Sequence, residues 1–95
     1  MNNTQERIAA VCDEIKAMLL EKNRKYGNSA LNPIRIFSQA DTIEQIRVRL
    51  DDKFNRYINR QSDEDEDIIQ DIIGYLVLYK IALELANESI PLTAS

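Results

Sequence analysis

Residues 68–85 read IIQDIIGYLVLYKIALEL, a long apolar run in a chain of 95 residues. We predict a helix that does not span a membrane, because polar side chains interrupt the run too often. Its apolar surface is wider than a helix needs to cover one side of a three-helix core, and Gly74 would permit a close helix crossing. We therefore expect this helix to be buried on two sides, in a homo-oligomer.

Residues 63–67 lead into this helix and are all acidic. Ser62 is the expected cap, with Asp65 at the reciprocal position of a capping box. A helix dipole stabilises negative side chains in the first turn, by about 0.3–1 kcal/mol each. Most of the acidic run is therefore explained without a function.

Two further helices are predicted upstream. The first begins near Thr4 with Asn3 as its cap and ends at Gly27, and the second begins at Asp41 or Thr42 and ends at 59–61. Apolar residues recur in both at steps of three and four, which indicates one buried stripe on each helix. The stripes consist of Ile8, Val11, Cys12, Ile15, Met18 and Leu19 in the first helix, and Ile43, Ile46, Leu50, Phe54 and Tyr57 in the second.

The connection over residues 27–41 is long for so small a domain, and such connections are often functional. Pro33 fits the first turn of a short helix over 33–39. We expect Ile34, Ile36 and Phe37 to pack this segment onto the bundle. The chain is thus predicted to be a single all-α domain over residues 1–95, with three main helices, a short one and a loosely held tail at 88–95.

Composition narrows the chemistry. The chain has one cysteine, Cys12, expected in the core, and no histidine, which excludes Ser-His and Cys-His catalysis and leaves carboxylates with a hard cation. The N-terminus lacks a secretory pattern, so we expect a cytoplasmic protein.

The charges are unevenly distributed along the chain. Residues 22–60 contain nine basic and four acidic side chains, whereas residues 61–95 contain one basic and eight acidic side chains. Since the net charge is −4, nonspecific DNA binding is not expected.

Polar side chains form one row on each of the last two helices. If these helices form an antiparallel hairpin, the rows converge, and their carboxylate and amide oxygens suit Mg²⁺. The metal candidates are Asp51, Asp52, Asn55, Asp67 and Asp71. The alternative is a set of ion pairs within the helices, Arg47 with Asp51 and Asp52 with Arg56. Asp71 lies within an apolar run and needs either a ligand or a basic partner, for which Arg47, Lys53 and Arg56 are available.

A basic cluster precedes the first glycine. Lys22, Arg24 and Lys25 could hold phosphates while Tyr26 stacks on a base. The alternative is a basic helix end that complements the helix dipole.

Three motifs together resemble one family, the small phage and bacterial proteins called nucleotide modification associated domain 1. The resemblance covers residues 19–79. The motifs are Lys22-x-x-x-Tyr26-Gly27-Asn28-Ser29, Arg49-x-x-Asp52-Lys53-x-x-Arg56 and Asp67-x-x-x-Asp71-x-x-x-Tyr75. The family in turn resembles the all-α nucleoside triphosphate pyrophosphatases of the MazG and dimeric dUTPase type, which are oligomeric and Mg²⁺-dependent. Their five acidic metal ligands are only partly matched here, so the resemblance implies nucleotide binding more than catalysis.

The resemblance implies a site for a phosphorylated nucleotide between helices or subunits. Its expected residues are Lys22, Arg24, Lys25, Tyr26, Asn28, Arg49, Lys53 and Arg56. In a phage setting such a protein would sequester a nucleotide signal used by host defence. Two alternatives stay open: a Mg²⁺-dependent pyrophosphatase, and an inhibitor that binds a host defence protein through the wide apolar face. None of the residues is assigned a catalytic role.

Overall fold

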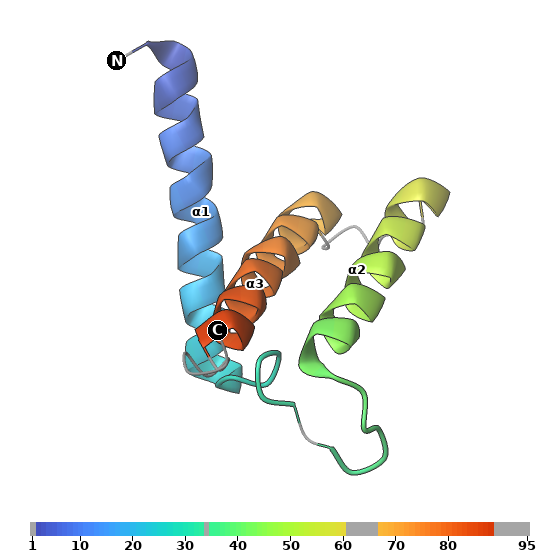
Figure 1. Cartoon of the computed structure of the whole chain (residues 1–95). Coiled ribbons are helices and arrows are strands. Elements are labelled where there is room, and N and C mark those ends of the chain that lie inside the picture. Colours follow the sequence, from blue (N-terminus) through green and yellow to red (C-terminus); the bar gives the residue numbers. More distant parts are fainter. Residues whose placement is uncertain (1, 34, 61–66, 89–95) are drawn as a thin grey trace.

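The computed structural model describes residues 2–33, 35–60 and 67–88. Within these ranges the chain forms three helices and no strand: α1 (Asn3–Tyr26), α2 (Thr42–Asn59) and α3 (Ile68–Glu88) (Figure 1). The all-α prediction is confirmed. No helix in the described ranges has the length and apolarity that crossing a membrane requires.

α1 begins one residue earlier than predicted. The Asn2 side chain accepts a hydrogen bond from the Gln5 backbone at 2.7 Å, and the Gln5 side chain accepts one from the Asn2 backbone at 3.3 Å, so Asn2 and Gln5 form the capping box. The prediction of Asn3 as the cap is wrong because two consecutive asparagines offer the same spacing. Gly27 ends the helix as predicted, with a φ of 62° and its N–H bonded to the Asn23 carbonyl.

α2 and α3 form an antiparallel hairpin. In the second half of α2, Lys53 lies opposite Asp71, which is in the first turn of α3. In the first half of α2, the Arg47 guanidinium donates to the hydroxyl of Tyr79, which is in the second half of α3, at 2.8 Å. The two helices therefore run in opposite directions. The core lies along this seam. It consists of Ile46, Leu50, Ile68, Ile72 and Ala82.

α3 begins directly after Asp67, whose carboxylate accepts a hydrogen bond from the Gln70 N–H at 2.9 Å. Asp67 therefore caps α3. The predicted cap Ser62 and its partner Asp65 lie outside the described residues, as does the predicted tail beyond position 88.

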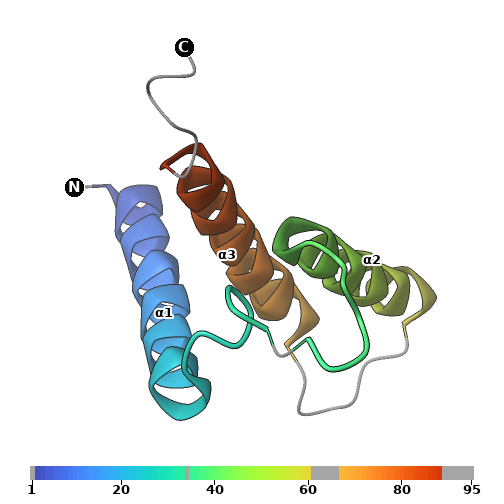
Figure 2. The same ribbon diagram turned by 60° about the horizontal axis from the view of Figure 1, so that its bottom comes forward.

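α1 crosses α3 at Gly74. A Cβ at this position would lie 3.1 Å from Met18 Cε and 3.2 Å from Leu19 Cδ2, which is closer than ordinary van der Waals contact. The predicted close crossing is confirmed. α1 lies along the opposite side of α3 from α2 (Figure 2).

The segment between α1 and α2 is not helical at its described residues, so the predicted helix over 33–39 is wrong there. The Arg35 guanidinium donates to the Ala40 carbonyl and to Thr42 Oγ1, and these bonds hold the chain in a loop instead. Ile36 and Phe37 do not pack onto the bundle, since Phe37 is 97% exposed. Ile34 lies outside the described residues.

Much apolar surface stays open in the single chain. Cys12 is exposed, contrary to the prediction, because the first half of α1 extends beyond the other two helices (Figure 1). α3 also exposes apolar side chains. Ile69, Leu76 and Leu83 follow one another at steps of seven residues and share one face, whereas Val77 and Leu85 lie on other sides of the helix. The predicted homo-oligomer stays a prediction, and this surface is what it would cover.

Candidate functional site

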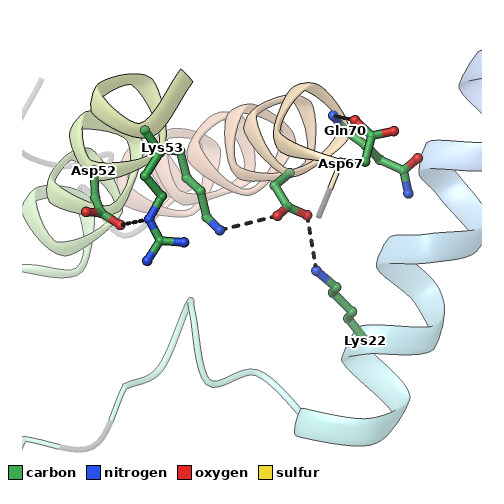
Figure 3. A network of polar contacts seen from close by, with 7 residues as sticks. Lys22, Asp52, Lys53, Asp67 and Gln70 are labelled. Carbon is green, nitrogen blue, oxygen red and sulfur yellow. Dashed lines mark hydrogen bonds and ion pairs between the residues drawn. The ribbon is translucent and has the colours of Figure 1, made fainter. Parts of the chain in front are cut away.

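Asp71 connects the three helices. From its place on α3, one carboxylate oxygen lies 3.6 Å from Lys22 Nζ on α1 and the other lies 3.3 Å from Lys53 Nζ on α2 (Figure 3). Lys53 is one of the three basic residues predicted from the sequence as available partners of Asp71. Lys22 is a second cation beside Asp71 and is not among those three. The Lys53 side chain is only 18% exposed, whereas that of Lys22 is 55% exposed. Asp71 therefore forms a half-buried ion pair with α2 and a looser one with α1.

A cavity of about 320 Å³ lies beside Asp71, between the end of α1, the loop at 27–31 and one side of α3. Its apolar walls come from the α1–α3 crossing. They are formed by Met18, Leu19, Gly74 and Leu78. Its polar lining consists of one cation, one carboxylate, two amides, two phenol rings and one hydroxyl. These groups belong to Lys22, Asp71, Asn23, Asn28, Tyr26, Tyr75 and Ser29.

Hydrogen bonds build the loop that closes this cavity. The Asn23 amide donates to the Gly27 carbonyl at 3.2 Å and to Asn28 Oδ1 at 2.8 Å. The Asn28 carbonyl in turn accepts the backbone N–H groups of Leu31 and Asn32. Because these bonds fix the turn after Gly27, the Asn28 side chain is held at the cavity wall. Asn23 was not predicted as a site residue, because its bonds to Gly27 and Asn28 depend on the turn that the chain makes after α1.

Only part of the predicted ligand set meets at the cavity. Lys22, Tyr26 and Asn28 line it, and Lys53 reaches it through Asp71. Four residues predicted as ligands lie outside the lining: Arg24, Lys25, Arg49 and Arg56. The Lys25 ammonium lies 5.7 Å from the centre of the exposed Tyr26 ring, so it lies beside a side chain that lines the cavity.

Arg24 forms an ion pair with Glu21. Its guanidinium donates two hydrogen bonds to the Glu21 carboxylate, at 2.9 and 2.5 Å. These bonds lower the pKa of Glu21 and raise the pKa of Arg24, because each charged group stabilises the charged form of the other. Arg56 likewise pairs with Asp52, at 3.5 Å, as the ion-pair alternative predicted.

The predicted metal ligands are dispersed over several local contacts. Asn55 accepts a hydrogen bond from Asn59, Asp67 caps α3, and Asp51 is exposed on α2. The predicted pair of Arg47 with Asp51 is replaced by a pair of Arg47 with Glu44. Within residues 2–33, 35–60 and 67–88, no three acidic or cysteine side chains lie close enough to hold one metal ion. The Mg²⁺ site stays a prediction.

Replacing Asp71 by asparagine is expected to lower the free energy of unfolding by about 1–3 kcal/mol, because Lys53 would lose its half-buried counter-charge. Urea denaturation followed by far-UV circular dichroism measures the change. Asp52→Asn is the matched control, since it removes an exposed pair whose loss costs at most about 1 kcal/mol. Equal losses in the two variants would contradict a central role for Asp71.

Comparison with protein-family models, curated proteins and solved structures found no match to this chain. The class is therefore defined by the fold and the cavity alone: an all-α hairpin of α2 and α3, joined by α1, with a polar and aromatic cavity at the α1–α3 crossing.

Proposed function

We propose that this protein binds a phosphorylated nucleotide in the cavity beside Asp71. The observation that carries the proposal is the presence of an aromatic ring, a lysine and two amides around one partly apolar cavity. A base stacked on an aromatic side chain gains about 1–3 kcal/mol, and a lysine ammonium is a common phosphate ligand. Tyr26 would stack on the base, Lys22 would bind phosphate, and Asn28 would bind a polar edge.

The size of the cavity favours a small ligand. Its volume of 320 Å³ lies at the lower end of the range of about 300–1,000 Å³ that small-molecule sites occupy. We therefore expect one nucleotide unit to fill it, with any further phosphates reaching past Lys22 toward Lys25 beside the Tyr26 ring.

The looseness of the Lys22–Asp71 pair also supports phosphate binding. Lys22 is more than half exposed and lies 3.6 Å from Asp71, so it can turn to a phosphate without leaving Asp71 unpaired. Lys53 would keep Asp71 neutralised from the other side, at 3.3 Å. Phosphate binding would then weaken one contact between α1 and α3 while leaving the α2–α3 pair intact.

Isothermal titration calorimetry against a panel of linear and cyclic nucleotides tests the proposal. We expect at least one nucleotide to bind, and both Lys22→Ala and Tyr26→Ala to weaken that binding roughly tenfold, or about 1.4 kcal/mol. Lys16→Ala is the control, because Lys16 is an exposed lysine of α1 that does not line the cavity. Absence of heat with every nucleotide at about micromolar protein would overturn the proposal.

A hydrolytic function is the second candidate, because the Asp71 carboxylate lines the same cavity. A Mg²⁺-dependent pyrophosphatase would need this carboxylate to hold the ion, so Asp71→Asn would abolish pyrophosphate release. A protein that only sequesters the nucleotide would show no turnover. In that case Asp71→Asn would retain or strengthen nucleotide binding, since it removes a negative charge beside the phosphates.

A further inference from the structure

The first half of α1 is a helix that its own chain leaves uncovered. Every residue from 2 to 14 is exposed, and Ile15 is the first buried residue of the helix. Figure 1 shows this half extending beyond α2 and α3. It nevertheless carries apolar side chains, since Ile8 is 58% exposed and Val11 is 50% exposed.

These exposed side chains continue the line by which α1 packs against α3. Ile8, Val11 and Ile15 follow one another at steps of three and four, so they lie on one face of the helix. An isolated helix of this length, about three turns, is marginally stable in water. A helix with an apolar stripe gains most of its stability by packing that stripe against another surface.

The charges beside the apolar stripe indicate which surface would cover it. Arg7 and Glu14 flank the same side of the stripe, two helical turns apart, and neither has an ion pair among the residues that the structure describes. In an antiparallel pair of identical helices with its twofold axis near residues 9 and 10, Arg7 lies next to Glu14 of the partner subunit. The symmetry produces this opposite-charge contact twice. A parallel pair would instead place the flank that carries Arg7 and Glu14 against the opposite flank of the partner's stripe, and this opposite-charge contact would be lost.

We infer that a second copy of this chain docks on the first half of α1, so that the two α1 helices pack antiparallel in a homodimer. Ile8 then packs against Val11 of the partner subunit, and Arg7 pairs with Glu14 of the partner subunit. The interface uses the end of α1 away from the cavity, whose α1 lining begins at Met18. Dimer formation is therefore separate from the proposed ligand binding, and either can fail without the other.

Sedimentation equilibrium of the full chain tests this interface. We expect the wild-type protein to be a dimer at about 100 µM. Glu14→Arg should weaken the dimer roughly tenfold, because it turns two ion pairs into two repulsive contacts. Asp13→Arg makes the same charge change at the neighbouring position, on the side of α1 opposite the stripe, and should leave the dimer unchanged.

The double variant Arg7→Glu with Glu14→Arg exchanges the two charges and should restore the wild-type dimer. Restoration separates an ion pair across the interface from a variant that simply fails to fold, and circular dichroism confirms the helix content of each protein. A monomeric wild type at this concentration, a dimer insensitive to Glu14→Arg, or a double variant as weak as the single one would each overturn the inference.

Discussion

Replacing Ile46 by alanine is expected to lower the free energy of unfolding by about 2–4 kcal/mol. Ile46 lies in the second turn of α2, its side chain is 1% exposed, and it is the largest side chain that the fold buries completely among the described residues. The substitution removes its apolar contacts with α3 and leaves a cavity that the α2–α3 seam can fill only in part. The effect is large for a chain of 95 residues, whose total stability is expected to be roughly 5–15 kcal/mol.

Urea denaturation measures this loss at a fixed protein concentration, because association would shift the apparent stability. Ile58→Ala is the matched control: it is the same substitution on the same helix, at a side chain that is 74% exposed. We expect it to change the free energy of unfolding by no more than about 0.5 kcal/mol. Similar losses in the two variants would show that the α2–α3 seam is not the core.

The seam between α2 and α3 could be predicted from the sequence because each helix carries its own apolar period. Ile46 and Leu50 are buried as predicted. Tyr57 belongs to the same stripe but is exposed, since it lies level with the first turn of α3 and little of the described chain reaches past that turn. Periodicity therefore identifies the apolar face of a helix, but it does not indicate where the neighbouring helix ends.

The candidate site shows the same limit, because the sequence indicates which residue needs a partner but not where two helices cross. A carboxylate within an apolar run indicates that Asp71 needs a partner, and Lys53 is one of its predicted partners because antiparallel helices bring it close. Lys22 is not among them, because its contact depends on where α1 crosses α3, and no spacing within α1 specifies that crossing. Arg35 is a similar case, since its bonds to Ala40 and Thr42 replace the predicted short helix.

A leucine at position 74 is expected to separate α1 from α3 and to abolish ligand binding in the neighbouring cavity. Gly74 forms part of the cavity wall, and a Cβ there would already lie 3.1 Å from Met18 and 3.2 Å from Leu19. The remaining leucine atoms would have to occupy the space of those two side chains. We expect Gly74→Leu to cost about 1–3 kcal/mol of stability through overpacking, although leucine favours a helix more than glycine does.

Gly74→Ala distinguishes the effect of crowding at the α1–α3 crossing from the effect of helix propensity. Alanine gains about 1 kcal/mol over glycine in a helix interior, and the atoms it would meet are the flexible ends of Met18 and Leu19, which can shift by a few tenths of an ångström. We therefore expect Gly74→Ala to stay within about 1 kcal/mol of the wild type, with its ligand binding retained. Hydrogen exchange in residues 15–26 reports on α1 directly and should accelerate in Gly74→Leu while α2 stays protected. If Gly74→Leu left both the protection of α1 and nucleotide binding unchanged, α1 would not be held against α3 at this crossing. Gly74 would then not form a wall of the ligand site beside Asp71.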